Sequence, residues 1–199
     1  DGRPYAERAE MSRQIMAAAG VTGIGLTLLP VLYSFGGFGE QPVGSAQHRF
    51  HNDAEGILEI IAAVAPDMAG NADMTVGLAP HSLRAVNAAG LQAARAGVKA
   101  INAQAPIHIH IAEQMKEVTD CQAWSGMRPV EWLYDSQPVD DSWCLVHATH
   151  LTAQECAAIA ASGAVAGICP TTEGNLGDGL FPLRGFLDGN GVFGIGSDS

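Results

Sequence analysis

Six short, continuous apolar segments recur along this chain and constrain its fold more than any other feature. Their starts lie roughly 20 to 50 residues apart, and the segments cover residues 23–32, 74–79, 107–112, 144–148, 164–169 and 192–196. Such distances are too long for hairpins and suit crossovers between parallel strands. Strands that are apolar throughout are typical of a parallel sheet covered on both faces. The spacing therefore predicts an α/β fold with about six parallel strands.

Most of the gaps between these segments carry a helical pattern. The clearest is the apolar stripe within residues 52–64, formed by Ile57, Leu58, Ile60 and Ile61. Thr152, with Glu155 three residues later, fits a capping box that opens a helix extending to residue 161. The other predicted helices cover residues 5–18, 83–103, two short stretches within 114–135, and 181–187.

Six parallel strands with helical crossovers fit either an open doubly wound sheet or most of a (β/α)₈ TIM barrel. No GxGxxG sequence follows the first strand and no Walker sequence is present, so the nucleotide-binding open sheets lose support. The chain begins in a helical pattern and stops soon after a strand. We therefore expect residues 1–199 to form a partial (β/α)₈ barrel domain that lacks N-terminal strands and the C-terminal closure.

Composition excludes several classes of function. Lysine and arginine number 10 against 21 aspartate and glutamate, a net charge of −11, which disfavours nucleic-acid binding. The uncharged residues 14–39 are interrupted by Pro30 and several glycines, so no membrane span is expected. No signal peptide is predicted, and the four cysteines have no CxxC spacing. We expect a cytoplasmic protein with reduced thiols.

Polar side chains gather where the predicted strands end. His81 and Arg84 follow the second strand, His110 and Glu113 lie at the exit of the third, His147 lies at the end of the fourth, and Asp198 follows the last. In a parallel barrel these ends share one rim, where such enzymes place their chemistry. Imidazole and carboxylate groups bind Zn²⁺ or Fe²⁺, which lowers the pKa of a bound water, and a carboxylate outside the metal shell can carry the proton. The pattern predicts a hydrolytic metal site.

Other histidines admit two interpretations. His108 shares a strand face with His110, either as a packed residue of the barrel interior or as a contact near the metal. His150 is expected to be structural, and His48 and His51 to lie on a solvated loop. Cys144 and Cys169 are expected to pack as small apolar residues, and neither is expected to act as a nucleophile.

At these residues the chain resembles the amidohydrolase superfamily. The matching stretches are HIHIAE with His110 and Glu113, LVHATH with His147, and GSDS with Asp198. A narrower set of stretches resembles the deiminases of this superfamily that act on formiminoglutamate in histidine breakdown, namely GLTLLPVLY, the FGG loop, HSLRAV, HIHIAEQ, DCQAWSG, CLVHATH, TEGNLGDG and GIGSDS.

The resemblance implies one divalent metal, zinc or else iron, with His110 and Asp198 among its ligands. It implies that Glu113 is the proton shuttle, that His147 holds or polarises the reacting water, and that His81 and Arg84 bind the substrate. The guanidinium of Arg84 would pair with a carboxylate of formiminoglutamate. The implied reaction hydrolyses the formimino group to N-formyl-L-glutamate and ammonia.

Two alternatives stay open at this point. One is a deaminase or chlorohydrolase of the same superfamily that acts on a heterocycle, and the other is a non-catalytic α/β binding module. The paired histidines of the first barrel strand lie outside the chain, so residues 1–199 alone are expected to be inactive. The sequence leaves the oligomeric state open, a homodimer included.

Overall fold

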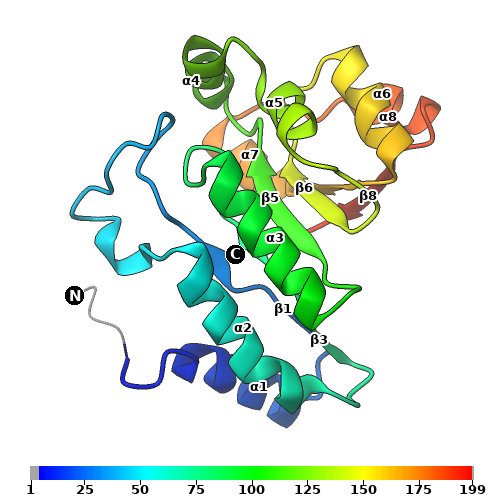
Figure 1. Cartoon of the computed structure of the whole chain (residues 1–199). Coiled ribbons are helices and arrows are strands. Elements are labelled where there is room, and N and C mark those ends of the chain that lie inside the picture. Colours follow the sequence, from blue (N-terminus) through cyan, green and yellow to red (C-terminus); the bar gives the residue numbers. More distant parts are fainter. Residues whose placement is uncertain (1–4, 199) are drawn as a thin grey trace. The chain divides into compact units, whose positions relative to one another are not determined.

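The computed structural model describes residues 5–198, and these form two compact units. The first comprises the described residues up to His81 together with Ala85–Ile107, and the second comprises Ser82–Arg84 and the described residues from His108 onward. Each unit has its own parallel strands and its own covering helices, as the ribbon shows (Figure 1).

In the first unit, each of the first two predicted strands is divided into two short strands. Strand β1 (Leu26–Leu28) pairs in parallel with β3 (Met74–Val76), and β2 (Val31–Leu32) pairs in parallel with β4 (Ala79–Pro80). The break between β1 and β2 contains Pro30, which has no N–H to donate to a neighbouring strand. The Pro30 carbonyl still accepts the N–H of Ala79 at 3.0 Å. Each pair of short strands therefore corresponds to one predicted strand.

The helices of this unit are α1 (Glu10–Thr22), the short 3₁₀ helix η1 (His48–Phe50), α2 (Ala54–Met68) and α3 (Ala88–Ile101). Asp53 and Asn87 cap α2 and α3 by accepting the N–H of Gly56 and Gly90, both at 2.8 Å. The predicted helix over 83–103 was wrong at its start, because the Asn87 cap places the first turn at Ala88. Arg84 accordingly lies in a turn before the helix.

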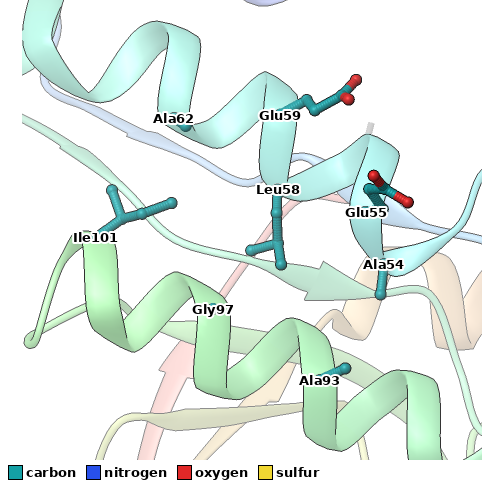
Figure 2. Close-up of a pocket in the computed structure, with 8 residues that line it drawn as sticks. All are labelled: Ala54, Glu55, Leu58, Glu59, Ala62, Ala93, Gly97 and Ile101. Carbon is teal, nitrogen blue, oxygen red and sulfur yellow. The ribbon is translucent and has the colours of Figure 1, made fainter.

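Helices α2 and α3 pack closely because α3 carries a glycine at the contact. A Cβ atom on Gly97 would lie 2.3 Å from Leu58 Cδ1. The two helices line a shallow, mostly apolar groove (Figure 2), formed by Ala54, Glu55, Leu58, Glu59, Ala62, Ala93, Gly97 and Ile101. Beneath it, the buried core includes Ile57, Ile61 and Val64 of α2 and Leu91, Ala94 and Val98 of α3.

The second unit is built on a four-stranded sheet in the order β5-β6-β7-β8. The strands are β5 (Ile107–Ile111), β6 (Trp143–His147), β7 (Val165–Ile168) and β8 (Val192–Ile195), and β7 pairs in parallel with both β6 and β8. The helices are α4 (Met115–Ser125), α5 (Pro129–Ser136), α6 (Ala153–Ser162), α7 (Pro170–Leu176) and α8 (Leu183–Asp188). Alternate residues of β5, β6 and β7 are buried, among them Ile109, Ile111, Trp143 and Leu145, whereas β8 is largely exposed.

The predicted α/β class and its parallel strands are confirmed, and so is the capping box, in which Thr152 and Glu155 bond reciprocally. Helix α7 was not predicted. Among the residues that the structure describes, no helix is long and apolar enough to cross a membrane.

The close approach of the chain at Gly77 generates a stability prediction. A Cβ on Gly77 would lie 2.2 Å from the carbonyl oxygen of Pro106, and backbone cannot move aside as a flexible side chain can. We expect Gly77→Ala to lower the free energy of unfolding by about 1–3 kcal/mol. Gly20→Ala is the control, because nothing lies within 4 Å of that Cβ in helix α1. Its effect should be neutral or stabilising, by up to ~1 kcal/mol. Urea unfolding of both variants measures the difference, and equal effects would contradict the steric argument.

Candidate functional site

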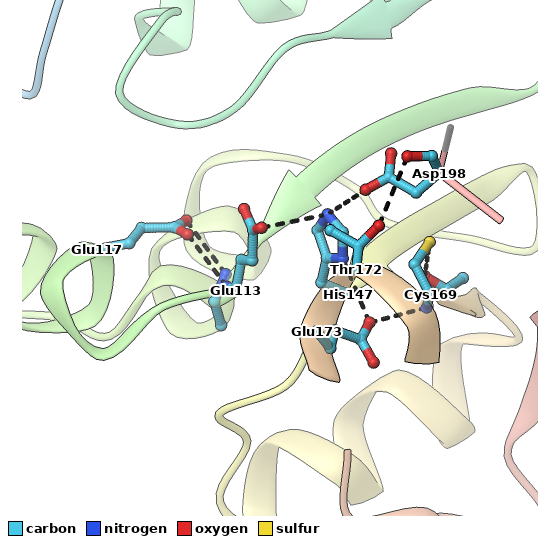
Figure 3. Close-up of polar contacts among 9 residues, drawn as sticks. Glu113, Glu117, His147, Cys169, Thr172, Glu173 and Asp198 are labelled. Carbon is cyan, nitrogen blue, oxygen red and sulfur yellow. Dashed lines mark hydrogen bonds and ion pairs between the residues drawn. The ribbon is translucent and has the colours of Figure 1, made fainter. Parts of the chain in front are cut away.

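Four of the six residues that the sequence singles out come together in the second unit. The rings of His110 and His147 stack with centroids 5.5 Å apart and planes 24° from parallel. His147 Nε2 lies 3.7 Å from Glu113 Oε1 and 3.9 Å from Asp198 Oδ2 (Figure 3). Strands β5, β6 and β8 therefore deliver two imidazoles and two carboxylates to one place.

An unusual backbone conformation marks the ends of these strands. Ala112, His147, Ala148 and Asp198 have φ values of 49°, 66°, 49° and 54°, in the left-handed region that favours glycine. A non-glycine residue held there costs on the order of 1–3 kcal/mol, and such residues cluster at functional sites. The left-handed turns end the regular alternation of the strands at the positions where the four side chains gather.

Backbone hydrogen bonds continue between β5 and β6 through these turns. The N–H of Ala148 donates to the Ile111 carbonyl at 3.0 Å, and the N–H of His150 donates to the Ala112 carbonyl at 3.0 Å. The two strand ends are thus fixed relative to each other even where their backbone is strained.

A buried carboxylate holds the segment that carries Glu113. Glu117, in the first turn of α4, accepts the N–H groups of Ala112 and Glu113 through its two oxygens, each at 3.1 Å (Figure 3). Burial raises the pKa of Glu117, while the guanidinium of Arg84 and the two backbone donors act in the opposite direction. Glu117 thereby fixes the backbone of Glu113, a role that the sequence analysis did not assign.

A second buried carboxylate lies behind His147. Glu173 Oε1, in the unpredicted helix α7, is 3.2 Å from His147 Nδ1 and accepts the N–H of Cys169 at 2.8 Å (Figure 3). Both His147 and Glu173 are almost fully buried. The sequence analysis missed Glu173, although it lies inside TEGNLGDG, one of the stretches that carry the resemblance.

The converging groups suit a divalent metal. Imidazole nitrogens and carboxylate oxygens are the donors that Zn²⁺ takes at catalytic sites. Separations of 3.7 and 3.9 Å between His147 Nε2 and the carboxylates of Glu113 and Asp198 exceed hydrogen-bond range. These groups thus approach a common point without bonding one another, and the donor set fits the implied metal.

A different trio offers a second arrangement of ligand atoms. Those of His147, Cys169 and Glu173 lie within 4.8 Å of one another. However, Glu173 Oε1 already receives the N–H of Cys169 and contacts His147 Nδ1. Burial and nearby carboxylates also raise the pKa of the Cys169 thiol to about 11, whereas a metal needs the thiolate. We therefore favour the side of His147 that faces Glu113 and Asp198.

The remaining predicted residues lie as follows. His81 belongs to the first unit, where its ring packs edge-on against Tyr33 at 4.7 Å, so its place on a shared rim stays a prediction. Arg84 is half-buried, and its charge opposes the rise that burial causes in the pKa of Glu117. Burial and the neighbouring His110 lower the pKa of His108. The carbonyl of His150 accepts a hydrogen bond from Arg128 Nη2, which suits the structural role expected for it.

Comparison with known proteins gives two close matches. The pattern of the amidohydrolase family matches residues 6–199. Formimidoylglutamate deiminase of Pseudomonas aeruginosa is 54% identical over 199 residues, which are 100% of this chain and 43% of that protein. The crystal structure of an amidohydrolase from Brucella melitensis matches with a TM-score of 0.93 and 50% identity, over 100% of this chain and 43% of that chain. The chain thus spans less than half the length of these relatives.

A more distant match shares the fold. A zinc-bound adenosine deaminase from Xanthomonas campestris matches with a TM-score of 0.77 at 22% identity, covering 92% of this chain and 39% of that chain. At this identity the likeness shows the fold alone. That structure contains bound zinc.

The buried thiols generate a prediction on pH and stability. Burial raises the pKa of Cys121, Cys144 and Cys169 from 9.0 to about 11. Their stabilising contribution is fully present below pH 9 and is lost as pH rises to 11, because over that range only the unfolded chain releases the thiol protons. Urea unfolding across this range should therefore show a falling free energy of unfolding. Replacing the three cysteines with alanine should flatten the decline, and an unchanged slope would contradict the assignment.

Proposed function

The chain belongs to the amidohydrolase family, and on that premise we propose that it forms part of an enzyme that hydrolyses the formimino group of N-formimino-L-glutamate, giving N-formyl-L-glutamate and ammonia. The observation that carries this proposal is the 54% identity to a formimidoylglutamate deiminase across all 199 residues. A cytoplasmic location accords with a role in histidine degradation.

The activity belongs to a protein longer than these 199 residues, in which the segment works as part of a (β/α)₈ barrel. Support comes from the relatives, of which it spans 43%. We propose that His110 and Asp198 are metal ligands and that a histidine pair from another segment completes the site. Zinc is the proposed metal, with Fe²⁺ as the alternative that the same donors accept.

Different residues of the site are proposed to carry out the two proton transfers of the reaction. When bound, the metal lowers the pKa of a water molecule toward neutrality. Asp198 and His147 Nε2, 3.9 Å apart, would be placed to accept a proton from a water molecule held between them. Glu113, 3.7 Å from the same nitrogen, delivers a proton to the nitrogen that leaves as ammonia.

Substrate recognition is assigned to His81 and Arg84. A planar guanidinium matches the two oxygens of a carboxylate, which formiminoglutamate offers and a flat heterocycle does not. The chain as a whole is acidic, so a local cation is needed to hold an anionic substrate. Arg84 supplies that charge beside α4, where it also acts on Glu117.

The alternative within the family is a deaminase acting on a heterocycle, since a zinc-bound adenosine deaminase has this fold. Steady-state turnover by the full-length protein, with formiminoglutamate, guanine and cytosine compared, separates the two. Turnover of guanine or cytosine in preference to formiminoglutamate would defeat the proposal. Full-length protein without bound metal after gentle purification would favour a non-catalytic binding module.

Replacing Glu113 and Asp198 should separate proton transfer from metal binding. Glu113→Gln is expected to retain the metal while kcat falls about 10²-fold or more, because positioned acid–base catalysis contributes roughly 10²–10⁴-fold. Asp198→Ala should lose metal as well as activity. Metal analysis and kcat on the same preparations test both expectations, and near-normal turnover by Glu113→Gln would exclude the shuttle role.

Replacing Arg84 tests the substrate contact. Breaking a buried charge pairing costs roughly 2–5 kcal/mol, so Arg84→Met should reduce kcat/KM by about 30-fold or more at ~1.4 kcal/mol per decade. The loss should appear mainly in KM, with metal content intact. Because Arg84 also acts on Glu117, the melting temperature is measured on the same preparation. A lower melting temperature with unchanged kcat/KM would assign Arg84 a purely structural role.

A further inference from the structure

Glu173 lies behind His147 and contacts both this histidine and the backbone before helix α7. Helix α7 begins at Pro170, immediately after β7, and the residue before it has no side-chain cap of its own. Glu173 instead accepts the N–H of Cys169, the residue that precedes the helix, at 2.8 Å. The same oxygen also lies 3.2 Å from His147 Nδ1, on a different strand end. One carboxylate oxygen therefore joins the end of β7 to the catalytic histidine at the end of β6.

This contact decides which ring nitrogen of His147 carries the proton. An ionised carboxylate has no proton to donate, so its oxygen can only accept at the 3.2 Å contact, and Nδ1 is then the donor. A ring that carries its proton on Nδ1 alone has a lone pair on Nε2. Nε2 is the atom that faces Glu113 and Asp198.

The same short helix reaches the metal side of the site. Thr172 Oγ1 lies 3.5 Å from the backbone carbonyl of Asp198, which it contacts as a donor (Figure 3). Because His147 and Glu173 are 1% and 4% exposed, water does not compete for the Nδ1 contact as it would at the surface. Helix α7 thus contacts two of the residues assigned to proton transfer.

We propose that Glu173 is a positioning residue that holds His147 with Nδ1 protonated and Nε2 directed toward Glu113 and Asp198. The proposal deepens the proposed function and rests on it for the role of His147, but the tautomer itself is independent of the substrate. A carboxylate bonded to the far nitrogen of a site histidine fixes both ring orientation and tautomer, and losing such a partner typically costs about 10–100-fold in activity.

The first experiment reads the tautomer directly in the full-length protein. Nitrogen-15 chemical shifts of labelled histidine, with His147 assigned by comparison with His147→Gln, distinguish a protonated from an unprotonated ring nitrogen. We expect wild-type His147 to be protonated at Nδ1. Protonation at Nε2 alone would overturn the proposal, and no substrate is needed for this result.

The second experiment compares two replacements of Glu173. In Glu173→Gln the amide oxygen still accepts both N–H groups, so the tautomer should be kept and kcat should fall by less than about 10-fold. In Glu173→Met no acceptor is left, so the two tautomers should mix and kcat should fall by about 10–100-fold, with KM changed little. Recovery of activity by glutamine relative to methionine is the signature of positioning.

Glu155→Gln is the matched control. Glu155 is another buried glutamate near a helix start, where it accepts the N–H of Thr152 at 2.7 Å and pairs with Arg128 at 2.9 Å, but no contact joins it to His147. This variant should lower the melting temperature without changing kcat or the His147 tautomer.

The outcomes separate the two proposals. A Glu173→Met protein with a lower melting temperature but unchanged kcat and tautomer would make Glu173 a helix cap only. If Glu173→Met does not fold, the wild-type and Glu173→Gln spectra still decide. If the wild-type protein does not turn over formiminoglutamate, the proposed function fails while the tautomer measurement continues to test Glu173.

Discussion

Buried carboxylates hold the strand ends of the second unit, and the geometry of the candidate site depends on them. Glu117, Glu155 and Glu173 each lie near the start of the helix that follows β5, β6 or β7, and each accepts backbone N–H groups of the preceding segment. A buried backbone N–H without a hydrogen-bond partner is destabilising. These carboxylates therefore stabilise the fold by accepting N–H groups that would otherwise be unpaired. Glu117 fixes the backbone of Glu113, and Glu173 fixes the ring of His147.

The sequence could predict the strands and most of the site because both follow from local pattern. Continuous apolar runs marked all six strand positions, and polar residues just after them marked His110, Glu113, His147 and Asp198. Parallel pairing then required those ends to lie on one edge of the sheet, which is where the second unit has them. Their catalytic roles come from the resemblance and stay proposals.

The residues that the sequence analysis missed depend on contacts between separate elements. Helix α7 is short and begins with Pro170, and its segment PTTEGNL carries two threonines and a glycine, so neither length nor periodicity indicated a helix. Glu173 gains its meaning only from the contact with His147, 26 residues away in the chain. The start of α3 was predicted too early because Leu83, Ala85 and Val86 continue the apolar pattern of the helix, although Asn87 after them is the N-cap.

Ala112 and Ala148, at the strand ends, have a left-handed backbone conformation, so local strain lies next to the residues of the candidate site. Glycine adopts this conformation without the steric penalty that Ala112 and Ala148 carry. Selection for heat resistance alone would therefore favour glycine at both positions. The same change would also give the backbone next to Glu113 and His147 more conformational freedom. Retaining alanine there keeps the orientation of the two side chains at the expense of some resistance to unfolding.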